Sequence, residues 1–439
     1  MSTSRSIQQD ALGLLELPLE IVLKIFNFCD LPSLGRLSQA CHELRSLCAD
    51  EILWRKIIRS TFLPVQGPSM GSGNTERICM VWKSLPAKTQ CQLIYGFKER
   101  KMKKSRTTYL YQLAAGINHK SPLCMHRVLL DDRGIWTCSL EKIMQLPWQF
   151  VDASLTTDAA RFTSYLECSD PARHIGDFTV SARYLVAGHW NGSITVVEAE
   201  STFQSRYECR PHLSDVHSVA VRDSLLFSGS RDHTVSFFDL DKKSPLLLAN
   251  LDDRIWCVAP HRRAPLVAIG TSGTTRSPLL RLSTRARDPF LMEQCNLRIF
   301  DFQSEAVLRN LNRGFRHGFG ILTAMFTDDN TLICGGHDGL LRIWDLREYR
   351  CVDELDSDLD SAVYCFCTDG AYTIATGHAN YNAVCLWDRR YARYPIQTHS
   401  IVQKHGETKA NCSVYGLCFT PFEMYIGLQD GVYRMEFCS

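Results

Sequence analysis

The sequence predicts a multidomain protein in which a small all-α module precedes a large all-β propeller of about seven blades. Apolar residues recur at helical spacing over residues 16–62, and strand–turn–strand units recur from about residue 135 to residue 439. A polar tail, 1–15, and a linker, 63–134, that is expected to be partly helical complete the chain. Its 439 residues are roughly two to three times the length of a typical domain.

The helical module has apolar positions at steps of three and four: Leu17, Ile21, Ile25 and Phe28, then Leu34, Leu37, Cys41 and Leu44. Pro18 suits a first helical turn because its φ is fixed and it has no N–H to leave unbonded. A unit of about 45 residues buries little of its surface. Its apolar residues therefore form either the internal core of a helical bundle or a surface that a partner completes.

The order of these residues resembles the F-box, whose pattern opens with Leu-Pro, passes through a leucine-rich second helix and ends with Leu-Trp. The matching residues are Leu17-Pro18-Leu19-Glu20-Ile21, Ile25, Leu31, Leu34, Leu37, Cys41 and Leu53-Trp54. Cys41 departs from the pattern, since the family more often has valine there. The resemblance implies binding to the Skp adaptor, which docks on a cullin scaffold. It places six residues on the adaptor-facing surface: Leu17, Pro18, Ile21, Leu31, Leu34 and Trp54.

The linker begins with a loop rich in proline and glycine over residues 63–75. The densest positive charge of the chain follows at residues 98–106. This run is either a solvated helix face in a connector or a nuclear localisation signal or phosphate-binding patch. The simpler account is the solvated face.

The repeated units share one pattern: an apolar strand, a small-residue turn holding Asp or Asn, and a strand that ends in an aromatic-Asp pair. The clearest copies are 225–240 and 332–346, and weaker ones are 185–197, 266–302, 373–388 and 423–437. The pattern resembles the WD repeat, with Trp344-Asp345 and Trp387-Asp388 as its dipeptide. About 305 residues follow position 134, which at ~40–45 residues per blade gives about seven blades, with eight as the alternative.

By this resemblance, a His, a Ser or Thr, the turn Asp and an aromatic residue form a hydrogen-bonded tie within a blade. The corresponding residues in the best repeat are His212, Ser228, Asp232 and Phe238. Phenylalanine has no N–H to donate, so this tie is expected to lack one member.

Composition and motifs indicate a non-catalytic intracellular protein without a cofactor. The net charge of +2 gives no reason to expect nucleic acid or a membrane as partner. Residues 1–10 lack a signal-peptide pattern, so the expected location is intracellular, with the cytoplasm and the nucleus both open, and the 19 cysteines are expected to be reduced. Cys365-Phe366-Cys367 does not have zinc-site spacing, and neither a GxxxxGK[ST] loop nor HExxH occurs. Equivalent positions in the repeat explain His189, His337 and His378 better than a metal site does.

Client-binding residues are expected where propeller loops converge on one face. By the family's geometry, Trp190, Arg231 and His337 precede a turn Asp or Asn, and Asp215 and Arg254 precede inner strands. Arg313 and Arg316 lie in the loop that leads into the fifth blade. Because arginine binds phosphate and carboxylate bidentately, the working hypothesis is a phosphorylated or acidic client segment. The alternative is that these arginines pair with neighbouring acids, for example Asp252 and Asp253 beside Arg254.

One blade is interrupted between Gly270 and Asn296 by an insertion that contains Arg276, Arg281, Arg285 and Arg287. Long insertions of this kind are functional or disordered, and a mobile loop costs little free energy. The segment 274–294 is therefore expected to be mobile, with recognition as the sharper alternative.

Together, the two parts resemble the F-box/WD-repeat family, also in the segments Asp253-Arg254-Ile255-Trp256 and Leu386-Trp387-Asp388-Arg389-Arg390. The resemblance implies the substrate receptor of a cullin-RING ubiquitin ligase, which holds a client near a recruited conjugating enzyme. A non-degradative scaffold is the alternative. The identity of the client, its phosphorylation and the oligomeric state stay open.

Overall fold

The structure, a computed structural model, describes residues 14, 17–26, 29, 31–50, 53, 107–112, 127–148, 162–198, 206–274, 296–311, 319–368, 373–391, 394–401, 412–420, 423–429 and 431–436. These residues fall into two compact units, one containing the helices and the other the strands. Within the described residues, no helix is both long and apolar enough to cross a membrane.

The helical unit contains α1 (Leu19–Phe26), α2 (Leu31–Ala40) and α3 (His42–Leu47). Helix α1 begins directly after Pro18, whose carbonyl oxygen accepts hydrogen bonds from the backbone N–H groups of Ile21 and Val22 at 2.9 and 3.1 Å. Cys41 is the N-cap of α3, and its sulfur accepts a hydrogen bond from Leu44 N at 3.4 Å. The departure from the family's valine at position 41 thus has a local role, because this side chain caps a helix.

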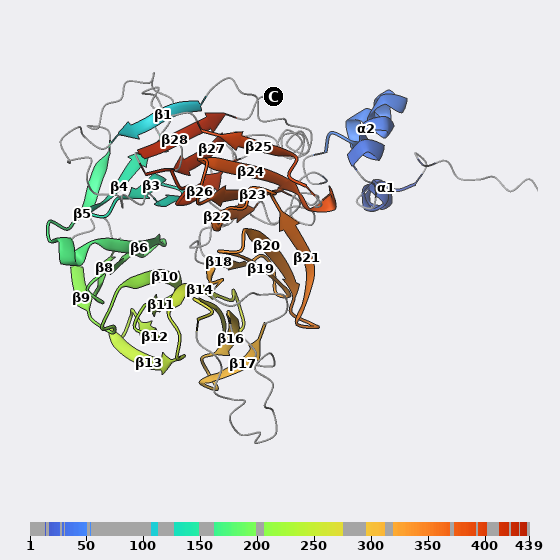
Figure 1. The fold of residues 1–439 in the computed structure, drawn as a ribbon. Coiled ribbons are helices and arrows are strands. Elements are labelled where there is room, and N and C mark those ends of the chain that lie inside the picture. The colour runs from blue at the N-terminus through green and yellow to red at the C-terminus, as the bar shows by residue number, and fades with distance from the viewer. Residues whose placement is uncertain are drawn as a thin grey trace, which may run out of the picture. The chain divides into compact units, whose positions relative to one another are not determined.

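The strands in the described part of the chain form seven four-stranded antiparallel sheets, the blades of a propeller (Figure 1). The predicted count of seven is therefore confirmed. Blades 1 to 3 consist of β2 (Arg127–Leu130), β3 (Gly134–Cys138), β4 (Lys142–Pro147) and β5 (Thr163–Glu167); β6 (Ile175–Val180), β7 (Tyr184–His189), β8 (Ile194–Glu198) and β9 (Arg206–Cys209); and β10 (Val216–Arg222), β11 (Leu225–Ser230), β12 (Thr234–Asp239) and β13 (Ser244–Asn250).

The remaining blades follow the same order from the inner strand outward. Blades 4 to 6 consist of β14 (Ile255–Pro260), β15 (Leu266–Thr271), β16 (Leu297–Asp301) and β17 (Ala306–Asn310); β18 (Ile321–Phe326), β19 (Thr331–Gly336), β20 (Leu340–Asp345) and β21 (Arg350–Asp356); and β22 (Val363–Thr368), β23 (Thr373–His378), β24 (Ala383–Asp388) and β25 (Gln397–Ser400). Blade 7 consists of β26 (Gly416–Phe419), β27 (Glu423–Gly427), β28 (Gly431–Glu436) and β1 (Thr107–Gln112).

The ring is closed by a strand from the segment that the sequence predicts to be a linker. Strand β1 pairs antiparallel with β28, from Thr107 opposite Met435 to Gln112 opposite Gly431. Strand β2 of blade 1 also precedes residue 135. The predicted boundary is corrected in this respect: propeller strands begin at Thr107. The physical reason is that pairing with β28 bonds the backbone groups of 107–112 and gives blade 7 the four strands of the other blades.

Adjacent blades pack through a small residue on one strand and a β-branched residue at the start of the next inner strand or just before it. A side-chain carbon added at Gly229 would lie 2.5 Å from Cγ2 of Ile255, and one added at Gly377 would lie 2.5 Å from Cγ1 of Val414. A larger residue than glycine therefore does not fit at these two positions without a shift of the neighbouring blade.

The predicted tie in blade 3 is confirmed. His212 is fully buried, with Nε2 2.8 Å from Ser228 Oγ and Nδ1 2.8 Å from Thr234 Oγ1. Asp232 accepts hydrogen bonds from Leu213 N at 2.7 Å and from Thr234 Oγ1 at 2.6 Å. Phe238 is buried but has no polar hydrogen to contribute.

Blades 5 and 6 satisfy the hydrogen-bonding groups of the corresponding turn and strands with different residues. In blade 6, Trp387 Nε1 donates to Thr376 Oγ1 at 3.0 Å, and the Thr376 oxygen also lies 3.0 Å from Nε2 of the buried His378. In blade 5, the turn residue Asp338 instead pairs with the buried Arg342, with Oδ2 and Nη1 2.5 Å apart. A turn carboxylate can thus be balanced by a histidine or by an arginine from the adjoining strand.

Candidate functional site

Helix α1 has two apolar faces, and only one of them is covered. Val22 and Phe26 are 2% and 0% exposed, whereas Ile21 and Ile25 are 41% and 38% exposed. Each pair is spaced by four residues, so each forms a stripe along the helix. We call Ile21 and Ile25, together with the half-exposed Leu19, the α1 stripe.

The residues predicted to face an adaptor differ in how far their side chains are exposed to solvent. Pro18 and Ile21 are exposed, and Leu17 is half-buried. Leu34 is 1% exposed, so its side chain belongs to the core of the helical unit rather than to the surface where the resemblance places it. Leu31 begins α2, while its side chain and the whole of Trp54 lie outside what the structure describes. Ile25, which the sequence analysis matched to the F-box pattern but did not place on the adaptor-facing surface, joins Ile21 on the exposed stripe.

Three of the predicted client-binding residues lie at equivalent places on one rim of the propeller. The backbone N–H groups of Trp190, Arg231 and His337 each donate to the residue that precedes an inner strand, namely the carbonyl oxygens of His174, Asp215 and Gly320, at 2.9 Å in each case. The three residues therefore have the same place in their blades, and their part in client binding stays a prediction. Arg313 and Arg316 lie outside the described residues.

Arg254 belongs to the same rim, since its carbonyl oxygen accepts from Ser272 N at 2.9 Å. Its side chain is exposed, and no ion pair joins it to another residue that the structure describes. The neighbouring Asp253 turns away and accepts from Gly273 N at 2.9 Å and Thr274 Oγ1 at 3.1 Å, at the base of the long insertion. Arg231, in contrast to Arg254, has an ion-pair partner, because its Nη1 is 3.5 Å from Asp215 Oδ2.

Inner-strand bulges add a set of aromatic residues that the sequence reasoning missed. The register of β10, β14 and β22 against their neighbours shifts around His217, Trp256 and Tyr364, and such bulges re-aim the extra side chain. Tyr415 has the equivalent position just before Gly416. The signal in the sequence is a β-branched residue followed by an aromatic one at the start of each strand: Val216-His217, Ile255-Trp256, Val363-Tyr364 and Val414-Tyr415.

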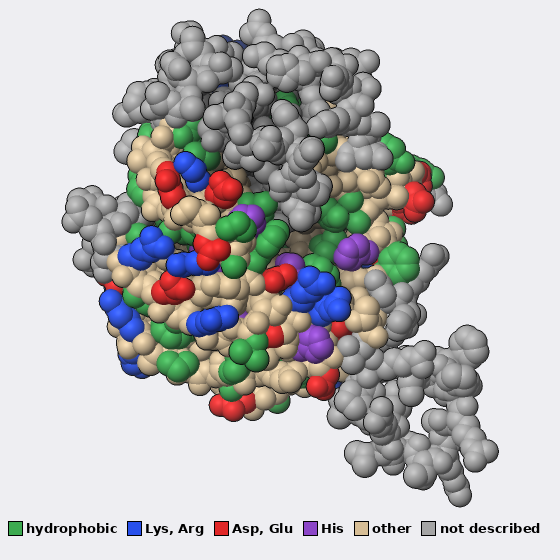
Figure 2. All heavy atoms as spheres, turned by 60° about the vertical axis from the view of Figure 1, so that its left-hand side comes forward, with side chains coloured by type: hydrophobic (Ala, Val, Ile, Leu, Met, Phe, Trp, Pro, Cys, Tyr) green, Lys and Arg blue, Asp and Glu red, His purple; other side chains and the backbone are tan. Residues whose placement is uncertain are grey.

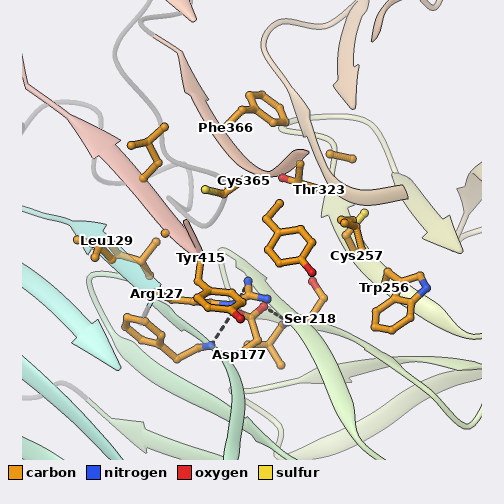
Figure 3. A pocket seen from close by; sticks show the side chains of 18 of the residues that line it. Arg127, Leu129, Asp177, Ser218, Trp256, Cys257, Thr323, Cys365, Phe366 and Tyr415 are labelled. Atoms are coloured by element: carbon orange, nitrogen blue, oxygen red, sulfur yellow. Dashed lines mark hydrogen bonds and ion pairs between the residues drawn. The ribbon is translucent and has the colours of Figure 1, made fainter. Parts of the chain in front are cut away.

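Trp256, Tyr364 and Tyr415, which we call the aromatic collar, line a cavity of about 70 Å³ in the centre of the propeller. All seven inner strands contribute to its wall (Figure 3). The rings of Tyr364 and Tyr415 have centroids 5.6 Å apart, and Trp256 packs against His217 at 4.5 Å and His337 at 6.1 Å. The collar thereby connects the cavity to the rim that contains His337 and Arg254. On the face viewed in Figure 2, histidine, hydrophobic, basic and acidic side chains lie next to one another.

Below the collar, Arg127 of β2 and Asp177 of β6 form an ion pair with Nη1 and Oδ1 2.8 Å apart. Asp177 is almost completely buried and also accepts from Val219 N at 2.9 Å, while the Arg127 side chain is 37% exposed. Burial raises the pKa of Asp177, and the charge of Arg127 opposes this shift. The guanidinium of Arg127 is therefore accessible from the cavity, whereas the Asp177 carboxylate that balances its charge is buried.

No group of His, Cys, Asp and Glu side chains among the described residues could hold a metal ion. His189 and His378 have equivalent positions, at the ends of β7 and β23, and are fully buried and bonded to threonine hydroxyls at 2.8 and 3.0 Å. The predicted equivalence is wrong for His337, which lies one position later and is exposed. Burial raises the pKa of Cys257 and Cys365, which line the cavity, to about 12, so both are neutral thiols near pH 7.

We expect acidification to destabilise the native chain more than a His217→Gln variant. Burial lowers the pKa of His217 to about 4, below about 6.5 for an unfolded chain. Because the unfolded chain takes up the proton first, the contribution of the neutral ring is complete above about pH 6.5. It is lost as the pH falls towards 4, by up to about 1.4 kcal/mol per pH unit. Calorimetric Tm values between pH 7 and 5 test this, with exposed His42→Gln as the control. Equal pH dependence in all three proteins would contradict it.

Comparisons with known proteins agree with this architecture. Residues 14–60 match the F-box-like family, and residues 203–239 and 310–345 match the WD domain, G-beta repeat family. The chain is 28% identical over 450 aligned residues to F-box/WD repeat-containing protein 4 of Mus musculus and of Homo sapiens, with 97% of this chain and 93% of each relative covered. The crystal structure of the WD40 β-propeller domain of Doa1 has a TM-score of 0.51 at 13% identity, and 71% of this chain and 92% of that chain are covered. This last likeness concerns the fold alone.

The chain therefore has the domain composition of an F-box/WD-repeat protein. Its similarity to F-box/WD repeat-containing protein 4, which is dactylin, extends over almost the whole of both chains. The predicted resemblance to this family is thus confirmed.

Proposed function

We propose that the chain is the substrate-recognition subunit of an SCF-type cullin-RING ubiquitin ligase. The F-box helices, for which we propose the range 16–62, bind the Skp adaptor and through it the cullin and RING subunits. The propeller binds the protein client. The observation that carries the proposal is the uncovered α1 stripe within a segment that matches the F-box-like family. An exposed apolar stripe on a helix is the kind of surface that a partner buries.

The proposed mechanism is tethering. A client on the propeller and a conjugating enzyme on the RING subunit would be part of one assembly, so their encounter becomes effectively intramolecular. No residue of this chain needs to take part in the transfer of ubiquitin, and the role is non-catalytic. The role also requires the compartment of the adaptor, in keeping with the intracellular location that the sequence predicts.

We further propose that the client binds on the rim that contains Trp190, Arg231, Arg254 and His337. Exposed Arg254 supports this, because its planar guanidinium can bind a client anion bidentately. Arg231 is a weaker candidate, since Asp215 already engages it.

The second candidate function is a scaffold that assembles proteins through its propeller without degrading them. A complete seven-bladed ring with an aromatic cavity would serve that role equally well. The two functions differ in their requirement for the adaptor, which a scaffold does not need.

We expect Ile21→Lys combined with Ile25→Lys to weaken binding of purified Skp adaptor to the full chain by about 100-fold or more, because an interface would have to bury two charges. Surface plasmon resonance measures the affinity, and co-capture of cullin confirms assembly. Leu246→Lys is the matched control, since Leu246 is 50% exposed on β13 of the propeller. A paired Leu17→Ala and Pro18→Ala variant tests the start of the F-box pattern.

Two outcomes would contradict the proposal. Adaptor binding that survives both lysine substitutions would show that the α1 stripe is not the interface. Failure of the intact, folded chain to bind adaptor at all would favour the scaffold function.

A further inference from the structure

Arg127 in the central cavity has guanidinium N–H donors that no described residue accepts. One terminal nitrogen of Arg127 lies 2.8 Å from Asp177, and no other described residue is bonded to its guanidinium. A guanidinium has five N–H donors in a planar fork, and carboxylates bind such forks in a bidentate manner. The side chain is 37% exposed and lines the cavity, so a ligand that enters from the collar can reach it.

Arg127 is also unusual among its equivalents in the propeller. The corresponding positions of the other six inner strands have Asp177, Ser218, Cys257, Thr323, Cys365 and Gly416. Figure 3 shows Arg127, Asp177, Ser218 and Tyr415 close together at one side of the cavity, with Thr323 and Cys365 across from them. A single strongly basic group thus lies among neutral side chains and one carboxylate.

We propose that this cavity receives a carboxylate of the client, bound by the free donors of Arg127 beneath the aromatic collar. The inference rests on the proposed receptor function, because it concerns how that client is recognised. It deepens the rim proposal by naming the chemical class of the inserted group.

The charges in the cavity favour a carboxylate over the other occupants. A client lysine or arginine would be repelled by Arg127 at close range. A phosphate, with about two negative charges near pH 7, would face the Asp177 carboxylate at the same guanidinium and would suffer the stronger repulsion. A neutral amide would lose the charge-assisted hydrogen bonds, which are roughly twice as strong as neutral ones.

The size and the surroundings of the cavity agree with this choice. A volume of about 70 Å³ suits a small planar group rather than a whole peptide segment. The half-buried collar would exclude water from the bound anion, and interactions between charges strengthen in such surroundings. Exposed Arg254 on the rim would meet acidic residues that flank the inserted one.

The test uses the full chain and a positional-scanning library of nine-residue peptides. Each pool is acetylated and amidated at its ends, is degenerate outside the central residue, and has Glu, Asp, Gln, phosphoserine or Ala at the centre. A further Ala pool has a free C-terminal carboxylate, which separates a side-chain carboxylate from a terminal one. Immobilised chain retains peptides, and mass spectrometry quantifies each pool.

We expect at least about tenfold more retention of a carboxylate pool, whether Glu, Asp or free C-terminus, than of the Gln pool. The preference should disappear in the double variant Arg127→Gln, Asp177→Asn, which removes both charges and keeps similar shapes. It should persist in Arg263→Gln, the control, because Arg263 is 83% exposed, pairs with Asp329 and lies outside the proposed client-binding rim. If the double variant does not fold, Arg127→Lys keeps the charge but loses the planar fork, and the preference should fall below about threefold.

Strongest retention of the phosphoserine pool, or equal retention of the Glu and Gln pools by folded chain, would overturn the inference. Adaptor binding is measured on the same preparations. If the native chain binds the adaptor but does not prefer carboxylate peptides, only the assignment of the cavity is rejected. If the native chain does not bind the adaptor, the receptor function itself is rejected.

Discussion

Replacement of Asp338 by alanine is expected to destabilise the propeller by about 3–5 kcal/mol, because it breaks a buried ion pair from one side. Asp338 Oδ2 lies 2.5 Å from Arg342 Nη1, and the two side chains are 9% and 3% exposed. The guanidinium also bonds to Glu354 through Nε at 3.0 Å, but Glu354 is 48% exposed and cannot replace the lost buried carboxylate. The variant would leave a cation in the interior without its main counter-charge.

Scanning calorimetry measures this effect as a Tm lowered by about 6–15 °C. Arg347→Ala is the matched control: Arg347 and Asp345 are also close, at 2.6 Å, but Arg347 is 70% exposed, so its removal should leave Tm nearly unchanged. The double variant Asp338→Ala, Arg342→Met removes the stranded charge and should recover part of the loss. An equal loss in the Arg347 control would contradict this account.

Asp232→Ala is expected to cost about 2–4 kcal/mol, because three groups lose a charged hydrogen-bond acceptor at once. These groups are Leu213 N at 2.7 Å, Thr234 N at 2.9 Å and Thr234 Oγ1 at 2.6 Å. The fully buried His212, whose Nδ1 lies 3.4 Å from the carboxylate, also loses this counter-charge. Burial alone would raise the pKa of Asp232, but hydrogen bonds from His212 and Thr234 hold it well below its usual range.

Denaturant unfolding at two pH values tests this prediction. The folded-state pKa of Asp232 is depressed, so its stabilisation is present above about pH 4 and is lost as the pH falls further. The cost of Asp232→Ala should therefore be full at pH 7 and smaller at pH 3. Asp232→Asn should cost less than Asp232→Ala, since blade 2 uses Asn191 at this position to accept from Ser193 N at 3.0 Å. A cost for Asp232→Ala that does not change with pH would show that the charge is unimportant.

Repetition explains how much of the fold could be predicted. Units such as 225–240 and 332–346 each contain two strands and the turn between them, and every copy reinforces the same interpretation. The rim positions of Trp190, Arg231 and His337 followed from the same repeat, because a residue next to the turn Asp or Asn has the same place in each blade. Helix α1 was predicted by its apolar spacing.

The features that the sequence analysis missed depend on contacts between distant segments. Strand β1 lies 319 residues before β28, counted from Gln112 to Gly431, and only their pairing identifies it as part of blade 7. Leu34 and Ile21 are both apolar positions of helical type, yet packing buries one and exposes the other. The pairing of Arg127 with Asp177 joins blades 1 and 2, and neither residue belongs to a recognisable motif.

The sequence by itself determined the class of each part, a blade count of about seven with eight as the alternative, and the local hydrogen-bonded tie of blade 3. These properties depend on residues close together in the chain, where periodicity and turn chemistry are visible without a fold. Only the tertiary structure decided which apolar residues of α1 stay uncovered, how the ring closes, and that the bulge aromatics meet above Arg127. Such features arise when seven inner strands converge on one axis, and a one-dimensional pattern does not record which side chains then come together.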